Sequence, residues 1–196
     1  MIPLILASSS ERRIFLLKKS GINFIAVNHK LESEPLFEDS KGNTPASIGD
    51  FVQNLALMKA KSLQDDYAEN WIIGADTLIY INGTVYGKPK NSKDAFNMIK
   101  ELSGKIHIVY TGIALINKYK NIYVTDYDKT AVKIKMLSDK EITSYLSEYP
   151  PAGKAGSYGI QDEHGIVESY EGSFENVLGL PVQKLKLILL PLNMRH

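Results

Sequence analysis

The sequence contains no cysteine among its 196 residues. Disulfide bonds, thiolate metal sites and cysteine nucleophiles are therefore excluded, and the absence fits a reducing compartment. The sequence also lacks an excess of charge, because 23 lysines and arginines face 22 aspartates and glutamates, for a formal net charge of +1. Such a chain has no overall attraction to nucleic acid or to acidic membranes. We expect no nucleic-acid partner, and any site for an anion must be built locally.

Long hydrophobic runs are the third absence. No stretch approaches the roughly 20 apolar residues of a membrane-spanning helix. Residues 1–7 carry no basic segment, and their apolar run is too short for a secretion signal. We therefore expect no membrane partner and a cytoplasmic location.

Short apolar runs alternate with segments of helical spacing, and this alternation predicts the fold class. Asn82-Gly83 is typical of a β-hairpin turn, and Ser138–Glu141 form a capping box at a helix start. We predict strands at 2–7, 24–27, 71–81, 106–117, 122–137 and within 158–178, and helices ending near 21, at 44–63, at 92–104, at 138–146 and from 181 onward. The pattern predicts one α/β domain over residues 1–196, with a mixed twisted sheet and flanking helices.

The segment 72–77 places a carboxylate, Asp76, and a hydroxyl, Thr77, at the end of an apolar run that reads as a buried strand. A carboxylate in such surroundings must be paired, bound to a metal, or aimed into a polar cleft. Two interpretations stay open on these residues alone. Either Asp76 works in a cleft, or it caps a turn after the strand, as Asp commonly does.

Two basic segments are candidates for binding an anion. Ser8 to Arg13 bring three hydroxyls and two arginines, Arg12 and Arg13, to a predicted helix start, where guanidinium donors and the helix dipole suit phosphate. The alternative is a capped helix with exposed arginines. Lys88 stands between Gly87 and Pro89, and it either serves a phosphate or is a solvated surface lysine. No GxxxxGK[ST] phosphate loop occurs.

A third segment, 153–161, combines glycines with Lys154 and Gln161. Glycines allow a close backbone approach to a ligand, and the amide of Gln161 offers a donor and an acceptor to a base edge. The alternative is an ordinary turn that leads into a strand.

For a metal, Glu32 and Asp76 are the candidate ligands, because hard cations such as Mg²⁺ take oxygen ligands. The four histidines show no HExxH spacing, so a zinc site is not expected. His107 lies between two isoleucines of a predicted strand, where a half-buried, hydrogen-bonded histidine is the default. No G-x-S-x-G motif supports a Ser-His-Asp triad.

Taken together and in this order, the motifs resemble the Maf family of nucleoside triphosphate pyrophosphatases. The resemblance covers nearly the whole chain. The sequence resembles most closely the branch that acts on dTTP and UTP, because that branch has Tyr-Gly-Ile-Gln where Tyr158 to Gln161 stand. The matching segments are 4–13, 74–77, 87–89, 102–104 with His107, 110–112, 154–161 and 179–181.

The resemblance implies two lobes around a central cleft and a metal-dependent hydrolysis, with Mg²⁺ or Mn²⁺, between the α and β phosphates of a nucleoside triphosphate. Asp76 is implied as the proton acceptor that activates water, and a homodimer is the first expectation for the assembly. Residues implied to set substrate choice are Arg12, Thr77 and Gln161; those implied to hold phosphates are Ser8, Arg13, Lys88 and Lys154; those implied near the cation are Glu32, with Glu34 close by, and Asp76.

Two positions depart from the family pattern. Glu11 stands where proline is usual, and Asp162 stands where glycine usually follows the glutamine. A charged side chain at 162 bears on the base pocket, so the same reaction on 7-methyl-GTP or another purine nucleotide stays open as an alternative. A nucleotide-binding regulator of septum formation with little turnover is the alternative from a different class.

Overall fold

The computed structural model describes residues 3–35, 37 and 45–192. Within these residues seven strands form one mixed sheet in the order β2-β1-β3-β5-β6-β7, with β4 paired to β3. The neighbours β2 and β3 run parallel to β1, and the remaining pairs are antiparallel. The mixed sheet confirms the predicted fold class. The strands are β1 (Leu4–Ala7), β2 (Phe24–Val27), β3 (Ile72–Ile81), β4 (Thr84–Tyr86), β5 (Ile106–Asn117), β6 (Ile122–Ile134) and β7 (Val167–Glu171).

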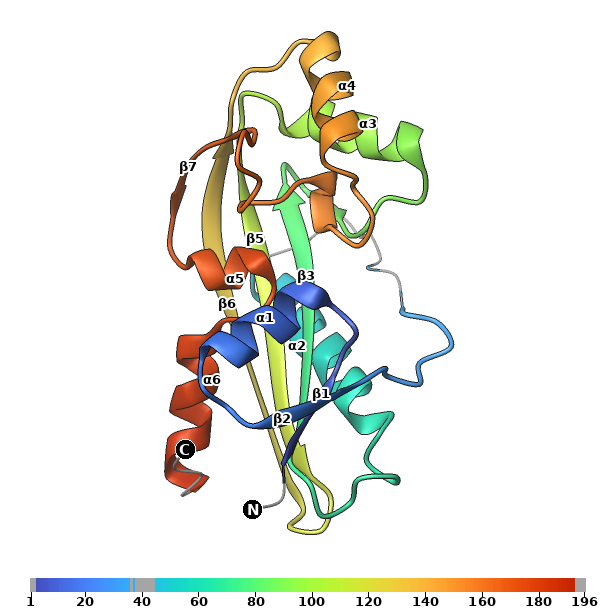
Figure 1. Cartoon of the computed structure of the whole chain (residues 1–196), viewed down its shortest axis with the longest axis vertical. Coiled ribbons are helices and arrows are strands. Elements are labelled where there is room, and N and C mark those ends of the chain that lie inside the picture. Colours follow the sequence, from blue (N-terminus) through green and yellow to red (C-terminus); the bar gives the residue numbers. More distant parts are fainter. Residues whose placement is uncertain (1–2, 36, 38–44, 193–196) are drawn as a thin grey trace.

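Helices flank this sheet on both faces and at one end (Figure 1). The helix α2 packs on one face, while α1, α5 and α6 cover the opposite face, and α3 and α4 lie at the far end of the long strands. The helices are α1 (Glu11–Lys19), α2 (Pro45–Lys61), α3 (Ser92–Leu102), α4 (Asp139–Glu148), α5 (Phe174–Leu178) and α6 (Val182–Leu189), with short 3-10 turns η1 (Ala155–Ser157) and η2 (Leu190–Leu192). None of the helices described here is long and apolar enough to cross a membrane.

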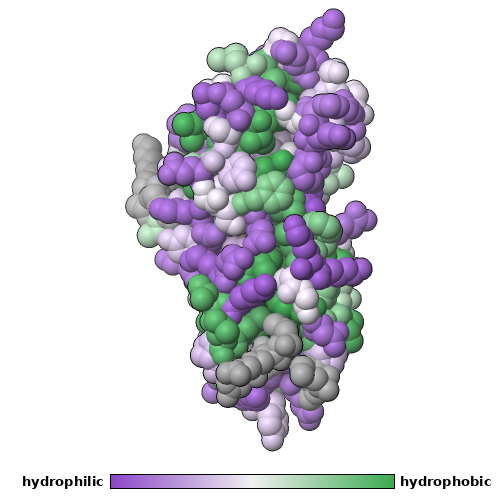
Figure 2. Space-filling model, turned by 60° about the vertical axis from the view of Figure 1, so that its left-hand side comes forward, coloured by the Kyte–Doolittle hydropathy of each residue, from purple (hydrophilic) through white to green (hydrophobic). Residues whose placement is uncertain are grey.

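On the face of the sheet opposite α2, two separate hydrophobic clusters follow one another along the strands. The first lies under α1, α5 and α6 and contains Leu6, Leu17 and Leu185. The second lies under α3 and α4 and contains Ile99 and Tyr145. Figure 2 shows hydrophobic side chains between hydrophilic ones along one face of the molecule.

The helix α2 lies unusually close to the centre of the sheet, because two glycines leave room for its backbone. A Cβ atom added to Gly74 would lie 2.0 Å from the carbonyl oxygen of Ala56, and one added to Gly112 would lie 2.2 Å from that of Val52. Such distances are far inside van der Waals contact, so any side chain at either position would push the helix away. The close packing brings side chains of α2 within reach of β3.

The structure corrects three predictions of local structure. Asp76 lies in the middle of the continuous strand β3, and not at a strand end. For the helix predicted at 92–104, Ser92 was the expected cap, but α3 is capped by Asn91, whose side chain accepts from the Asp94 amide. Residues 174–178 form the helix α5, which begins at the cap Ser173, where strands and turns were expected. The predicted hairpin at Asn82-Gly83 and the capping box at Ser138 are confirmed.

Candidate functional site

The sheet is open along one edge of β3, and this opening defines the site. On that edge β1 pairs only with Ile72 and Ile73, and β4 pairs only with residues 79–81. On this edge no strand of the described residues pairs with the stretch between them, which contains Asp76 and Thr77, while β5 pairs with it on the other edge. Because successive side chains of a strand point to opposite faces, Asp76 faces α2 and Thr77 faces α1 and α5. A gap in the sheet edge makes both side chains accessible to one ligand.

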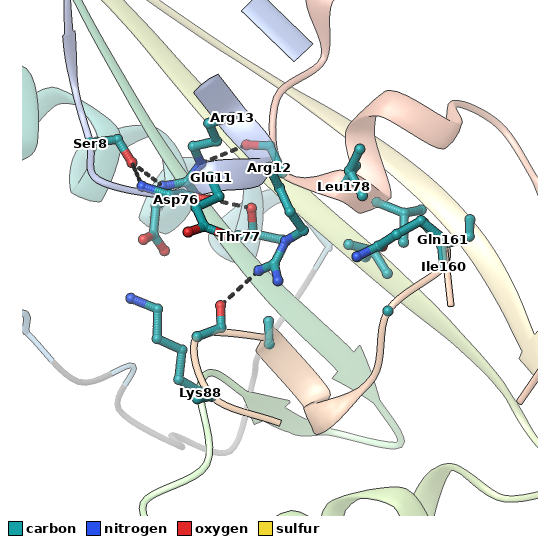
Figure 3. Close-up of a pocket in the computed structure, with 18 of the residues that line it drawn as sticks. Ser8, Glu11, Arg12, Arg13, Asp76, Thr77, Lys88, Ile160, Gln161 and Leu178 are labelled. Carbon is teal, nitrogen blue, oxygen red and sulfur yellow. Dashed lines mark hydrogen bonds between the residues drawn. The ribbon is translucent and has the colours of Figure 1, made fainter. Parts of the chain in front are cut away.

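A cavity of about 420 Å³ occupies this opening. Its wall comes from segments that are far apart in the sequence: the loop before α1 and its first turn, His29 after β2, Lys59 of α2, the centre of β3, Lys88 after β4, Val109 of β5, the loop 152–161, and the end of α5. Figure 3 shows Ser8, Asp76 and Lys88 gathered on one side of the cavity and Gln161 with Ile160 on the other, with Arg12 between them. The cavity therefore has a charged end and a loop end.

A buried lysine joins two carboxylates at the charged end. Lys59 of α2 forms an ion pair with Asp76, and its side chain is 2% exposed against 8% for Asp76. The same amine lies 2.8 Å from a carboxylate oxygen of Glu34. Partial burial alone raises the pKa of Glu34, but the hydrogen bond and the charge of Lys59, with Lys88 and His29, outweigh it and lower the pKa. Lys59 thus provides the positive charge that a carboxylate inside the sheet requires.

Arg13 ties the start of α1 to β3 and to the end of α5. Its guanidinium donates to the carbonyl oxygen of Gly179 at 2.8 Å, to the hydroxyl of Thr77 at 3.2 Å and to that of Ser8 at 3.5 Å. Burial lowers the pKa of Arg13, opposed by the charge of Asp76. A guanidinium has no deprotonated form at physiological pH. The site therefore holds a fixed, half-buried positive charge beside the Asp76 carboxylate.

Thr77 continues this network into the sheet. Its hydroxyl lies 3.1 Å from that of Thr111 on β5, and Thr111 in turn donates to the carbonyl oxygen of Asn176 at 2.8 Å. The orientation of Thr77 is thus set from both sides, by Arg13 and by Thr111.

Arg12 reaches across the cavity from the first turn of α1 to the loop 152–161. Its guanidinium donates to the carbonyl oxygen of Gly153 at 2.7 Å, and the side chain remains partly exposed (Figure 3). Burial lowers its pKa, and the Asp162 carboxylate opposes this effect. Arg12 therefore links the two ends of the cavity.

The loop end is formed by Tyr158, Gly159, Ile160 and Gln161. The hydroxyl of Tyr158 lies 2.7 Å from the Nε2 atom of the buried His107. Burial lowers the pKa of His107 to about 4, so this imidazole is neutral at physiological pH. The Gln161 side chain is exposed beside the cavity, where its amide is accessible to a ligand.

The structure brings most of the predicted site residues to one cavity: Ser8, Arg12, Arg13, Asp76, Thr77, Lys88 and Gln161 all line it. Lys154 and Glu32 are not among the lining residues. The Lys154 amine instead lies 3.1 Å from the Asp162 carboxylate, and its side chain is 12% exposed. Glu32 is exposed, whereas Glu34, two residues further on, reaches Lys59.

Two basic side chains that line the cavity, those of Lys59 and His29, were not predicted as site residues from the sequence. For Lys59 a signal exists. It follows Ile48, Val52 and Leu55 at spacings of four, three and four residues, and these three are buried on one face of α2. A lysine at an apolar position of such a stripe must find a buried anion. His29 lies in an irregular segment and carries no comparable signal.

The charged end suits a cation that arrives with its ligand. Asp76 and Glu34 are joined through Lys59, but no group of three or more His, Asp or Glu side chains in the described segments is placed to hold a metal ion. Mg²⁺ commonly uses one or two protein carboxylates and takes its other ligands from phosphates and water. The donor set therefore fits a hard cation shared with a polyphosphate better than a preformed protein cage.

The chemistry of the lining suits a polyanion at the charged end and a polar group at the loop end. Four basic side chains, of Arg12, Arg13, Lys59 and Lys88, line the cavity beside the first turn of α1, whose backbone N–H groups favour anions. Serine hydroxyls at 8–10 add further donors.

Comparison with known proteins agrees with this geometry. The family model described as "Maf-like protein" matches residues 3–191, and the chain belongs to this family. A protein of Thermosipho melanesiensis named "dTTP/UTP pyrophosphatase" is 44% identical over 183 residues, covering 93% of each chain. Proteins with the same name from Clostridium botulinum (strain Kyoto) and Clostridium perfringens (strain SM101) are 42% and 41% identical, covering 95% and 92% of both chains, respectively. The predicted family is therefore confirmed.

Proposed function

We propose that this chain hydrolyses nucleoside triphosphates, with dTTP and UTP as substrates, to the nucleoside monophosphate and pyrophosphate. The names of the relatives that match it over nearly its full length support the reaction and the pyrimidine substrates. The observation that carries the proposal is the division of one cavity into a cationic end beside the Asp76 carboxylate and an uncharged loop end. A triphosphate with a base attached has the same division.

The phosphates are assigned to the charged end. Arg13 and Lys88 supply fixed and mobile positive charge, and Ser8 adds a hydroxyl. A nucleophile approaches a polyphosphate only after its negative charge is screened. Asp76 and Glu34, together with substrate phosphates, would hold a divalent cation, Mg²⁺ or Mn²⁺, which would supply further screening. In this proposal Lys154 neutralises Asp162 and does not hold a phosphate.

The base is assigned to the loop end. Gln161 presents both a donor and an acceptor, as the Watson–Crick edge of thymine or uracil requires. Arg12 and Thr77 lie between the two ends, where they contact the parts of the substrate that connect base and phosphates. Substrate choice is therefore assigned to Arg12, Thr77 and Gln161.

Asp76 is assigned as the general base that takes a proton from the attacking water. It lines the cavity, one of its oxygens is held by Lys59, and it lies in the middle of β3 where that strand pairs with β5. A general base contributes roughly 10²–10⁴-fold to the rate.

The experiment is a panel of nucleotides assayed for pyrophosphate and for orthophosphate, with Mg²⁺ and with Mn²⁺. We expect dTTP and UTP to yield pyrophosphate in molar amounts equal to those of dTMP and UMP. Chelation of the metal by EDTA should stop the reaction. Faster turnover of 7-methyl-GTP or another purine nucleotide would overturn the substrate assignment. Tight dTTP binding without pyrophosphate release would favour a nucleotide-binding regulator instead.

A further inference from the structure

The Asp162 carboxylate is the centre of a buried polar cluster behind the loop end of the cavity. Its side chain is 5% exposed. It accepts a hydrogen bond from the Tyr145 hydroxyl, lies 3.1 Å from the Lys154 amine, and accepts from the Gly159 amide at 3.0 Å. Burial, and then the bond to Asp162, raise the pKa of Tyr145, so its hydroxyl keeps its proton and donates.

These contacts close a four-residue turn. The Asp162 amide points back to the Gly159 carbonyl at 3.4 Å, a weak bond, while the Asp162 side chain accepts from the Gly159 amide. The two central residues of the turn, Ile160 and Gln161, both line the cavity. The side chain of Asp162 therefore holds the turn that presents Ile160 and Gln161 to a ligand.

The fit between Asp162 and Gly159 is tight. A Cβ atom added to Gly159 would lie 2.5 Å from a carboxylate oxygen of Asp162. A bulkier residue at 159 would therefore displace the carboxylate, and removal of the carboxylate would leave the Gly159 amide with only the Tyr145 hydroxyl, at 3.1 Å. The preceding residue, Tyr158, is held independently by His107. The start of the loop is thus fixed by a histidine, and its turn by Asp162.

Lys154 supplies the positive charge that balances Asp162 in this cluster. A carboxylate this deeply buried requires a positive partner, and Lys154 is 12% exposed at hydrogen-bond distance from both carboxylate oxygens. The pair keeps one negative and one positive charge out of the cavity, so the base end presents uncharged groups.

We propose that Asp162, paired with Lys154, is a positioning residue for base recognition, because it fixes the turn that presents Ile160 and Gln161. It contacts no reacting atom and acts through the turn. The inference rests on the proposed function for the identity of the ligand, a pyrimidine nucleoside triphosphate.

The test compares Asp162→Ala, which removes every acceptor, with Asp162→Asn, which keeps one oxygen for the Gly159 or Tyr145 donor. Asp65→Ala is the matched control, since Asp65 also pairs with a lysine, Lys118, but on the surface. Steady-state kinetics are measured with dTTP and with GTP, and hydrogen exchange is followed in a peptide that covers 159–161. If Asp162→Ala fails to fold because Lys154 is left unpaired, Asp162→Ala with Lys154→Met replaces it.

We expect Asp162→Ala to raise KM for dTTP by about tenfold or more and to leave kcat within about twofold, because a binding contact is lost and the reacting atoms are untouched. The preference for dTTP over GTP falls, the 159–161 peptide exchanges faster, Asp162→Asn shows a smaller effect, and Asp65→Ala behaves as wild type. A folded Asp162→Ala protein with unchanged KM and unchanged preference would overturn the inference, as would an equal loss of kcat for both nucleotides with KM kept.

Failure of the proposed function gives a different result. If the wild-type protein hydrolyses no nucleotide, affinity for the α,β-methylene analogue of dTTP is compared by calorimetry between the wild type and Asp162→Ala. Weaker binding by the variant supports the positioning role without turnover. Equal binding, or no binding by either protein, refutes it.

Discussion

Replacing Lys59 by methionine is expected to destabilise the fold strongly. Methionine matches the length of the buried lysine stem and removes only its charge. In the wild-type protein the Lys59 amine lies between Asp76 and Glu34, and the side chains are 2%, 8% and 38% exposed. The variant leaves Asp76 inside the sheet without its counter-charge.

The expected loss in the free energy of unfolding follows from how deeply the contacts of Lys59 with Asp76 and with Glu34 are buried. Removing one partner of a buried ion pair costs about 3–5 kcal/mol, and this range applies to Lys59 with Asp76. The half-exposed contact with Glu34 adds at most about 1 kcal/mol. For a chain of this length, 3–5 kcal/mol lowers Tm by about 6–20 °C. A loss of this size is a large part of the stability of a typical domain.

The assay is urea unfolding followed by circular dichroism, with Lys61→Met as the matched control. Lys61 lies on the same helix, but it is exposed and its amine lies over the Tyr123 ring. We expect its substitution to change the free energy of unfolding by less than about 1 kcal/mol. Equal unfolding midpoints for the two variants would refute a buried Lys59. A second variant, Lys59→Met with Asp76→Asn, removes both charges and is expected to recover part of the loss.

Two further predictions concern packing and pH. Gly74→Ala places a Cβ atom 2.0 Å from the Ala56 carbonyl oxygen, so we expect a loss of about 1–3 kcal/mol in urea unfolding. Gly87→Ala, whose Cβ would meet Leu78 at 3.6 Å, serves as its control, and equal midpoints would contradict the close packing of α2. For His107, burial lowers the pKa from 6.5 to about 4, so between these values the unfolded chain binds a proton that the folded protein does not. Its contribution to stability is therefore lost as pH falls, by about 2 kcal/mol between pH 7 and pH 5. His107→Gln should remove this part of the pH dependence, and an unchanged difference between the two pH values would contradict it.

The sequence predicted the elements of the sheet well because their signals are local. Alternating or continuous apolar runs located β2 and β5 with the bounds that the structure shows, and cap and turn residues located α4 and the hairpin after β3. The short helix α5 was missed because five residues hold too little periodicity to be distinguished from a strand.

The sequence predicted most of the residues of the candidate site, but it did not predict how they are arranged in space. A strand was predicted over 71–81, but Asp76 was read as the end of its first apolar run, because an acid inside such a run reads as an interruption. In the structure the strand continues through it, and the opening arises because β1 and β4 pair with opposite ends of β3. Which neighbouring strands stop short of one another is a tertiary property that the spacing of residues does not encode.

The apolar stripe of α2 signals that Lys59 needs a buried anion, but local patterns do not show which residues pair with one another in the site. Lys59 meets Asp76 across 17 positions. The choice of Glu34 over Glu32 depends on the path of an irregular segment. Lys154 and Asp162 are only eight positions apart, but their contact follows from the turn between them.

The assignment of Asp76 as the general base is tested most directly by pyrophosphate release from dTTP, measured for the wild-type protein and for Asp76→Asn at saturating Mg²⁺. Circular dichroism and an unfolding curve are recorded for both, because this substitution also disturbs the pair with Lys59. We expect the folded variant to bind dTTP and its turnover to fall by roughly 10²–10⁴-fold. Turnover near the wild-type rate in a folded Asp76→Asn protein would contradict the assignment of Asp76 as the general base.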